Sequence, residues 1–118
     1  MLRIYTLSNC DTCRAATKWL RGRGLKFEEF AIRETPPSLP DLQVALEAHA
    51  GDVRRLFNVA GREYRAQKLG EKLPVMSEAE ALALLAQNGS LVKRPFVAGD
   101  GVALVGFDAA AWAEKLGR

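Results

Sequence analysis

The hydrophobic positions of this chain follow two patterns: short β-rich runs, and longer stretches with apolar residues three or four apart. The first half has an apolar run at residues 2–7, a helical repeat at 12–23 and a second apolar run at 25–32. Gly22 and Gly24 are typical of a helix end. These segments predict a β-α-β unit. Its helix is expected to bury one face made of Ala15, Ala16, Trp19 and Leu20.

The second half predicts mostly helices, followed by a hairpin. Ser38, Ser77 and Asp108 are expected to cap helices at residues 39–50, 78–87 and 109–116, and Glu80 completes a capping box with Ser77. A short helix is expected at 53–57, and residues 58–74 are expected to be irregular and rich in Arg and Lys, with at most one helical turn. Gly99-Asp100-Gly101 predicts a hairpin turn between strands at 96–98 and 102–107.

The predicted order is therefore β-α-β-α-α-α-β-β-α, without repeats, linkers or low-complexity segments. We expect a single α/β domain over residues 1–118, with a mixed sheet. A Cys-x-x-Cys pair directly after the first strand is typical of a thioredoxin-like (glutaredoxin-like) fold. The helices between the two halves are expected to form an inserted segment of that fold.

Composition and charge exclude several classes of protein. The chain has 118 residues, 48% of them hydrophobic, and a formal net charge of +3. It has no apolar run long enough for a membrane span, no signal-peptide pattern and no Lys/Arg block of the kind that binds nucleic acid. We therefore expect a cytoplasmic monomer that contacts neither a membrane nor nucleic acid directly. Arginines gather locally at Arg54, Arg55, Arg62 and Arg65, as a solvated surface or as an anion site.

The two cysteines, Cys10 and Cys13, lie where the first strand meets the first helix. Two cysteines are too few for a secreted disulfide scaffold, and in a reducing compartment such a pair is more often catalytic or redox-sensing. The first turn of a helix stabilises a thiolate through unpaired N–H groups and the helix dipole. Arg14 adds to this effect and Asp11 opposes it. We expect Cys10 to be the exposed, attacking sulfur and Cys13 to be the resolving thiol.

Two other interpretations of the cysteines remain open. A zinc half-site needs two more ligands, and His49 is the only other His or Cys, whereas two inert core thiols need none. His49 is expected at the surface end of a helix, and Trp19 and Trp112 are expected in the core. Pro95 stands where thioredoxin-like folds hold a cis-proline opposite the cysteine pair, and either isomer fits the sequence. In the cis arrangement Arg94 would point toward Cys10 and hold an anionic group there.

Across essentially its whole length the chain resembles the ArsC/Spx family, and most closely its ArsC-like branch with a Cys-x-x-Cys. The segments that carry the resemblance are Tyr5-Thr6, Asn9-Cys10-Asp11-Thr12-Cys13-Arg14, Phe57-Asn58, Gly61, Tyr64-Arg65, Lys72-Leu73-Pro74, Met76-Ser77-Glu78, Asn88-Gly89, Lys93-Arg94-Pro95 and Val105-Gly106-Phe107.

The resemblance implies one activity directly, the glutaredoxin-coupled reduction of arsenate. Members of the family with that activity use the first cysteine, here Cys10, as nucleophile and three arginines to bind the oxyanion. One of the three maps onto Arg94, but the other two fall at Asn58 and Gly106. Arg54, Arg62 or Arg65 are candidates to replace them.

The resemblance also implies two other functions. Spx-type regulators use the same cysteine pair as a redox switch and bind the RNA polymerase α subunit through the middle helices, where Gly51 is a loose match. YffB-like proteins are proposed glutathione-dependent thiol reductases. Our leading hypothesis is a thiol–disulfide oxidoreductase with no bound cofactor and with glutathione as co-substrate, served by glutaredoxin or thioredoxin. Its expected anion- and substrate-binding residues are Asn9, Arg14, Arg65, Arg94 and Pro95.

Overall fold

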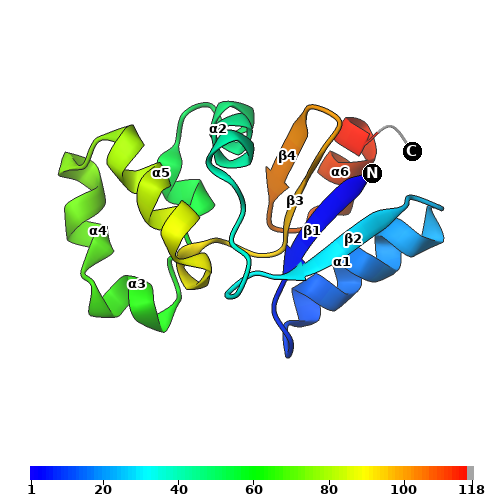
Figure 1. Cartoon of the computed structure of the whole chain (residues 1–118), viewed down its shortest axis with the longest axis horizontal. Helices are drawn as coiled ribbons and strands as arrows, with labels where there is room; N and C mark the ends of the chain where they lie inside the picture. The colour runs from blue at the N-terminus through cyan, green and yellow to red at the C-terminus, as the bar shows by residue number, and fades with distance from the viewer. Residues whose placement is uncertain (117–118) are drawn as a thin grey trace.

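A four-stranded mixed sheet forms the centre of the molecule, with strand order β2-β1-β3-β4 (Figure 1). β1 (Leu2–Thr6) runs parallel to β2 (Phe27–Ala31) and antiparallel to β3 (Phe96–Gly99). β3 pairs antiparallel with β4 (Val102–Val105). The computed structural model describes residues 1–116. These strand directions are those expected for a thioredoxin-like fold.

Helices cover the two faces of the sheet unequally (Figure 1). α1 (Asp11–Gly22) and α6 (Ala109–Leu116) pack on one face, where Leu20 and Trp112 share a buried cluster with Ile4 of β1. The opposite face packs against a larger helical lobe, whose buried cluster joins Tyr5 of β1 to the helices of the inserted segment. That lobe contains α2 (Leu39–Ala48), α3 (Arg62–Ala66), α4 (Leu69–Lys72), α5 (Glu78–Gln87) and the 3₁₀ turns η1 (Val53–Leu56), η2 (Leu73–Val75) and η3 (Gly89–Leu91).

Local signals in the sequence placed most helix ends correctly. The Ser38 and Asp108 side chains accept backbone N–H groups of the first turns of α2 and α6, and Ser77 and Glu80 form a full capping box on α5. α1 ends in a Schellman arrangement, with Gly24 at φ +69° and the Leu25 N–H donating to the Leu20 carbonyl. The hairpin turn is also confirmed, because Asp100 and Gly101 both have positive φ, as a type I′ turn requires.

Two sequence predictions about helices were wrong. Residues 58–74 are not irregular, since α3, α4 and most of η2 lie there. Each of these helices is too short for its apolar spacing to show, and tertiary packing stabilises them instead. On α1, Ala15 is exposed and Thr17 is buried, so the inner face is rotated toward Cys13, Ala16 and Leu20. The Thr17 hydroxyl tolerates burial because it donates to the Arg14 carbonyl at 3.1 Å.

His49 lies at the end of α2 as predicted, but it is half-buried rather than on the surface. Its Nε2 atom is buried and has no hydrogen-bond partner among residues 1–116. Burial and the nearby charge of Arg55 lower the pKa of His49, so the ring stays neutral at physiological pH. Trp112 is 1% exposed, as expected of a core residue, and Trp19 packs beside it with 6.0 Å between ring centroids.

Two backbone contacts tie the segment before β3 to distant parts of the chain. An isolated antiparallel bridge joins Phe57 to Val92, flanked by a hydrogen bond of 2.8 Å from the Asn58 N–H to the Leu91 carbonyl. One turn earlier, the backbone at Gly89 touches Ile32 so closely that a Cβ there would lie 1.7 Å from the Ile32 carbonyl oxygen. The loop after β2 and the segment before α3 are thereby held beside the residues that lead into β3.

No helix within residues 1–116 combines the length and the apolar composition needed to cross a bilayer.

The contact at Gly89 yields a stability prediction. Gly89→Ala forces the backbone at residue 89 away from the backbone at Ile32. We expect this substitution to lower the free energy of unfolding by about 3 kcal/mol. Gly22→Ala is the matched control, because nothing lies within 4 Å of its added Cβ and the residue is helical. We expect that control to raise stability by up to about 1 kcal/mol. Urea denaturation of both variants measures the difference, and equal midpoints would contradict the prediction.

Candidate functional site

Cys10 occupies the N-cap of α1, at the mouth of the helix. Its backbone is extended (φ −114°, ψ 107°), and its Sγ accepts a hydrogen bond from the Cys13 N–H at 3.2 Å. The sulfur thus fills the place of the usual oxygen cap, and the same N–H would stabilise a thiolate there. Cys10 is partly exposed, so a second sulfur can reach it from solvent.

Cys13 lies one turn further along α1 and is 2% exposed. Burial, followed by a side-chain hydrogen bond with Cys10, raises the pKa of Cys13 to about 12, although a backbone hydrogen bond from Leu7 and the charge of Arg94 oppose this effect. Cys13 is therefore a neutral thiol at physiological pH. The structure makes the two cysteines neighbours with different environments, one open and one enclosed.

Asn9 and Arg14 flank the pair in different ways. Asn9 has φ +63°, a left-handed conformation that Asn tolerates well, and it turns the chain from β1 into α1. Arg14 is exposed and forms an ion pair with Asp11 on the same helix. Asn9 thus shapes the turn through its backbone, whereas the Arg14 guanidinium lies at the surface beside the cysteines.

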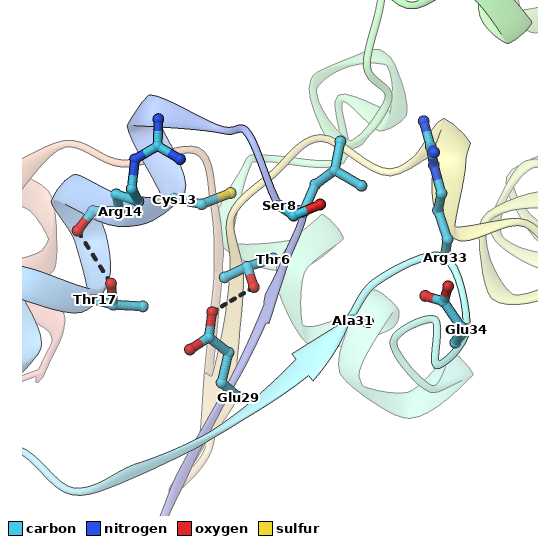
Figure 2. Close-up of a pocket in the computed structure, with 10 residues that line it drawn as sticks. Thr6, Ser8, Cys13, Arg14, Thr17, Glu29, Ala31, Arg33 and Glu34 are labelled. Carbon is cyan, nitrogen blue, oxygen red and sulfur yellow. Dashed lines mark hydrogen bonds between the residues drawn. The ribbon is translucent and has the colours of Figure 1, made fainter.

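A cavity of about 480 Å³ opens beside Cys13, between the first turns of α1, the end of β1 and the edge strand β2 (Figure 2). Figure 2 shows the Cys13 sulfur on one side of this cavity and Arg33 on the other, with Thr6 and Ser8 between them. The Thr6 hydroxyl donates to the Glu29 carboxylate at 2.6 Å. The lining therefore carries both signs of charge, from Glu29 and Glu34 and from Arg14 and Arg33.

Arg94 lies two residues before the first residue of β3, and the bond between Arg94 and Pro95 is cis. Pro95 is buried, and its carbonyl accepts the Gly106 N–H at 2.9 Å, which joins it to the end of β4. The Arg94 guanidinium donates to the Ser90 carbonyl at 3.3 Å, which anchors one edge of the group. Arg94 also lines a second cavity, of about 560 Å³.

The second cavity holds three arginines from three separate segments: Arg33 after β2, Arg62 at the start of α3, and Arg94. The ion pairs among residues 1–116 are Arg3 with Asp41 and Arg14 with Asp11, so none of the three arginines has a carboxylate partner there. Glu63 lies in the same cavity, where its carboxylate accepts the Asn88 amide at 2.6 Å. Arg33 lines both cavities, so the two cavities lie next to each other.

The two positions where the family's other arginines were expected have different roles here. Asn58 lines the second cavity, and its side-chain nitrogen would lie 2.7 Å from a Cβ on Gly61. Gly106 has φ +68°, and a Cβ there would lie 3.0 Å from Cε of Lys93. An arginine at residue 106 would therefore be strained by its backbone.

Arg65 and Arg54, two arginines singled out from the sequence, lie elsewhere. Arg65 lines a cavity of about 290 Å³ with Val59 and Lys68, and Arg54 lines cavities formed with Asp52. Of the arginines offered as substitutes, Arg62 is the one that shares a cavity with Arg94.

Sequence reasoning missed Arg33, Glu29 and Thr6. Arg33 lies in a loop without a motif. Its position depends on the contact of Ile32 with Gly89, and no sequence pattern indicates that contact because the two residues are far apart in the chain. For Thr6 and Glu29 a signal existed, because side chains two apart on a strand share a face. Thr6 pairs with Ala31 of β2, and Glu29 lies two residues before Ala31 on the same strand.

No group of three His, Cys, Asp or Glu side chains within residues 1–116 is arranged to hold a metal ion. His49, the remaining candidate ligand, lies at the end of α2 and lines neither cavity.

Comparison with known proteins gives consistent results. The sequence model of the ArsC family matches residues 5–115. The uncharacterized protein YusI of Bacillus subtilis is 42% identical over 106 residues, 90% of each chain, and the global transcriptional regulator Spx of Enterococcus faecalis is 27% identical over 92% of this chain and 80% of its own. A structure from Streptococcus mutans UA159, described as a possible arsenate reductase, superposes with a TM-score of 0.87 at 33% identity, covering 100% of this chain and 98% of the other. The predicted thioredoxin-like fold is confirmed.

The environments of the two thiols yield an alkylation prediction. In Cys10→Ser, burial keeps the Cys13 thiol protonated, so we expect iodoacetamide at pH 8 to modify it at least about a hundredfold more slowly than in urea. In Cys13→Ser, we expect Cys10 to react readily in the native protein. Both rates are read by mass spectrometry, and equal rates for the two variants in urea are the control.

The raised pKa of Cys13 also sets a pH dependence of stability. The protonated thiol is favoured in the folded state, so this contribution is complete below the unfolded pKa of 9.0 and is lost as the pH rises toward 12. We expect the unfolding free energy of wild type to fall across that range more steeply than that of Cys13→Ala. Parallel pH profiles in urea titrations would contradict the assignment.

Proposed function

Because the chain belongs to the ArsC family, we propose that it is a thiol–disulfide oxidoreductase that works with glutathione. The observation that carries this proposal is the pairing of a partly exposed Cys10 at the N-cap of α1 with an enclosed Cys13 one turn behind it. Cys10 is the nucleophile and Cys13 is the resolving thiol. Arg94 binds a carboxylate of the substrate, and Pro95 shapes the backbone that faces it.

The proposed reaction proceeds in two exchanges. The Cys10 thiolate attacks one sulfur of a disulfide, forms a mixed disulfide with it and releases the other half as a thiolate. Cys13 then loses its proton to the released thiolate and attacks Cys10 Sγ, which frees the second half and leaves a Cys10–Cys13 disulfide. Two electrons pass from the dithiol to the substrate. Two glutathione molecules return them and leave as glutathione disulfide.

The raised pKa of Cys13 supports this order of events. A protonated, buried thiol does not compete with Cys10 for the incoming disulfide. When Cys10 forms a mixed disulfide, it no longer carries a negative charge. The charge of Cys10 is one of the causes that raise the pKa of Cys13, so its loss makes Cys13 easier to deprotonate. Arg94, whose charge lowers the pKa of Cys13, then assists the second step.

A coupled assay tests the proposal. Hydroxyethyl disulfide is offered with glutathione, glutathione reductase and NADPH, and the rate of NADPH oxidation is followed. We expect Cys10→Ser to lose at least about a hundredfold of the wild-type rate, since the nucleophile is gone. Cys13→Ser should accumulate one glutathione per chain, visible by mass. Lys18→Ala, an exposed change on the same helix, is the control and should keep the wild-type rate.

The same assay contains the result that would refute the proposal. Wild-type protein without turnover above the uncatalysed rate, at any glutathione concentration, would leave the dithiol without an oxidoreductase role.

The arsenate reductase alternative rests on Arg94 and on the relative from Streptococcus mutans UA159. Asn58 and Gly106 weaken it, because they remove two of the three arginines that the resemblance implies. Arsenate-dependent turnover that disappears in Arg94→Ala would favour this alternative over the disulfide reaction.

A redox-switched regulator is the second alternative, favoured by relatives named as Spx regulators that match 92% of this chain. In that function the cysteine pair changes the binding of the RNA polymerase α subunit and has no turnover of its own. Pull-down of purified α subunit by the reduced and the oxidised protein distinguishes the two functions.

A further inference from the structure

We propose that Arg33, Arg62 and Arg94 together form a carboxylate-binding site that recognises the peptide portion of the disulfide substrate. This inference rests on the proposed function and assigns it a substrate class: a cysteine-containing peptide with more than one carboxylate, of which glutathione is the small example. Two of the three residues, Arg33 and Arg62, lie outside the positions where the family's arginines were expected.

The first support is the charge of the second cavity. Arg33, Arg62 and Arg94 line a space of about 560 Å³ and have no carboxylate partner among residues 1–116. The cavity's one acid, Glu63, is outnumbered and accepts the Asn88 amide. Guanidinium groups bind carboxylates through two parallel hydrogen bonds, so unpaired arginines around a hollow are suited to a ligand with several carboxylates.

The second support is that backbone contacts fix the segments that carry these arginines. The backbone contact of Gly89 with Ile32 sets the position of Arg33, and the Phe57–Val92 bridge brings the segment before Arg62 beside the segment of Arg94. The Arg94 guanidinium is anchored by the Ser90 carbonyl. The Arg33 and Arg62 side chains are exposed, so their backbones are fixed while their guanidinium groups are free to turn toward a ligand. A fixed backbone lowers the ordering cost of binding, which favours affinity.

The third support is the connection to the dithiol. Arg33 also lines the cavity beside Cys13, and Cys10, which lines neither cavity, lies at the N-cap one turn before Cys13. A ligand whose sulfur reaches Cys10 at the mouth of α1 can therefore extend past Arg33 into the arginine cavity. The volume also favours a peptide over a small oxyanion, because a single tetrahedral ion fills a minor part of such a space. Glu29 and Glu34 on the dithiol side are placed to receive an ammonium group of the same ligand.

Calorimetric titration with S-methylglutathione tests the site without any redox chemistry, because the blocked thiol cannot exchange. We expect Arg33→Gln and Arg62→Gln each to raise the Kd about tenfold, the loss typical of a hydrogen bond to a charged group. Arg33→Lys should fall between wild type and Arg33→Gln, since it keeps the charge but loses the fork. Arg21→Gln, the same charge change at the far end of α1, is the matched control and should bind as wild type does.

Each result separates this inference from the proposed function. Wild-type affinity in Arg33→Gln and Arg62→Gln, with disulfide turnover intact, would overturn the arginine site and leave the oxidoreductase standing. Tenfold losses in both variants, with no turnover by wild type, would support the site and refute the reaction. Arsenate or inorganic phosphate that binds more tightly than S-methylglutathione and displaces it would overturn the peptide assignment in favour of an oxyanion site.

Discussion

The site depends on the backbone contact between Gly89 and Ile32. Any other residue at position 89 would push these two segments of the chain apart, because its Cβ would collide with the Ile32 carbonyl. This contact sets the loop after β2 against the turn that leads into β3. The Phe57–Val92 bridge does the same for the segment before α3. Backbone groups make both contacts, so the positions of Arg33, Asn58 and Arg94 follow from main-chain geometry. Side chains from three distant parts of the sequence then meet at one place.

Some features of the site depend on local structure and others on tertiary structure. The proximity of the two cysteines is a local feature, because an N-cap residue and the residue three positions later are neighbours in any helix that begins there. Burial then makes the two thiols unequal, since the low-dielectric interior favours the neutral form of Cys13. In the proposed function, the positive charge that recognises the substrate comes from the inserted lobe and the loops beside it. On this proposal one part of the fold supplies the thiols and another part supplies the charge that selects a ligand.

The fold alone does not distinguish the functions found among the relatives of this chain. A regulator named Spx and a structure described as a possible arsenate reductase both match more than nine-tenths of it. Distinctions must come from the groups around the dithiol. Here Asn58 and a left-handed Gly106 stand where arginines were expected, while Arg33 and Arg62 bring positive charge to the cavity from other segments. The positive charge is retained but comes from other positions, and we propose for this reason that the ligand is a larger and more extended anion.

The sequence by itself determined the strands, the major helices and their caps, the hairpin turn and the location of the dithiol, because these depend on residues within a few positions of one another. The thioredoxin-like fold followed from their order and from the place of the cysteines. The short helices α3 and α4, the burial of Thr17 and of His49, and the cis bond before Pro95 were decided by tertiary structure. So was the meeting of Arg33 with Arg62 and Arg94 in one cavity. The reason is physical: these features depend on contacts between segments far apart in the chain, and periodicity or local propensity carries no record of such contacts.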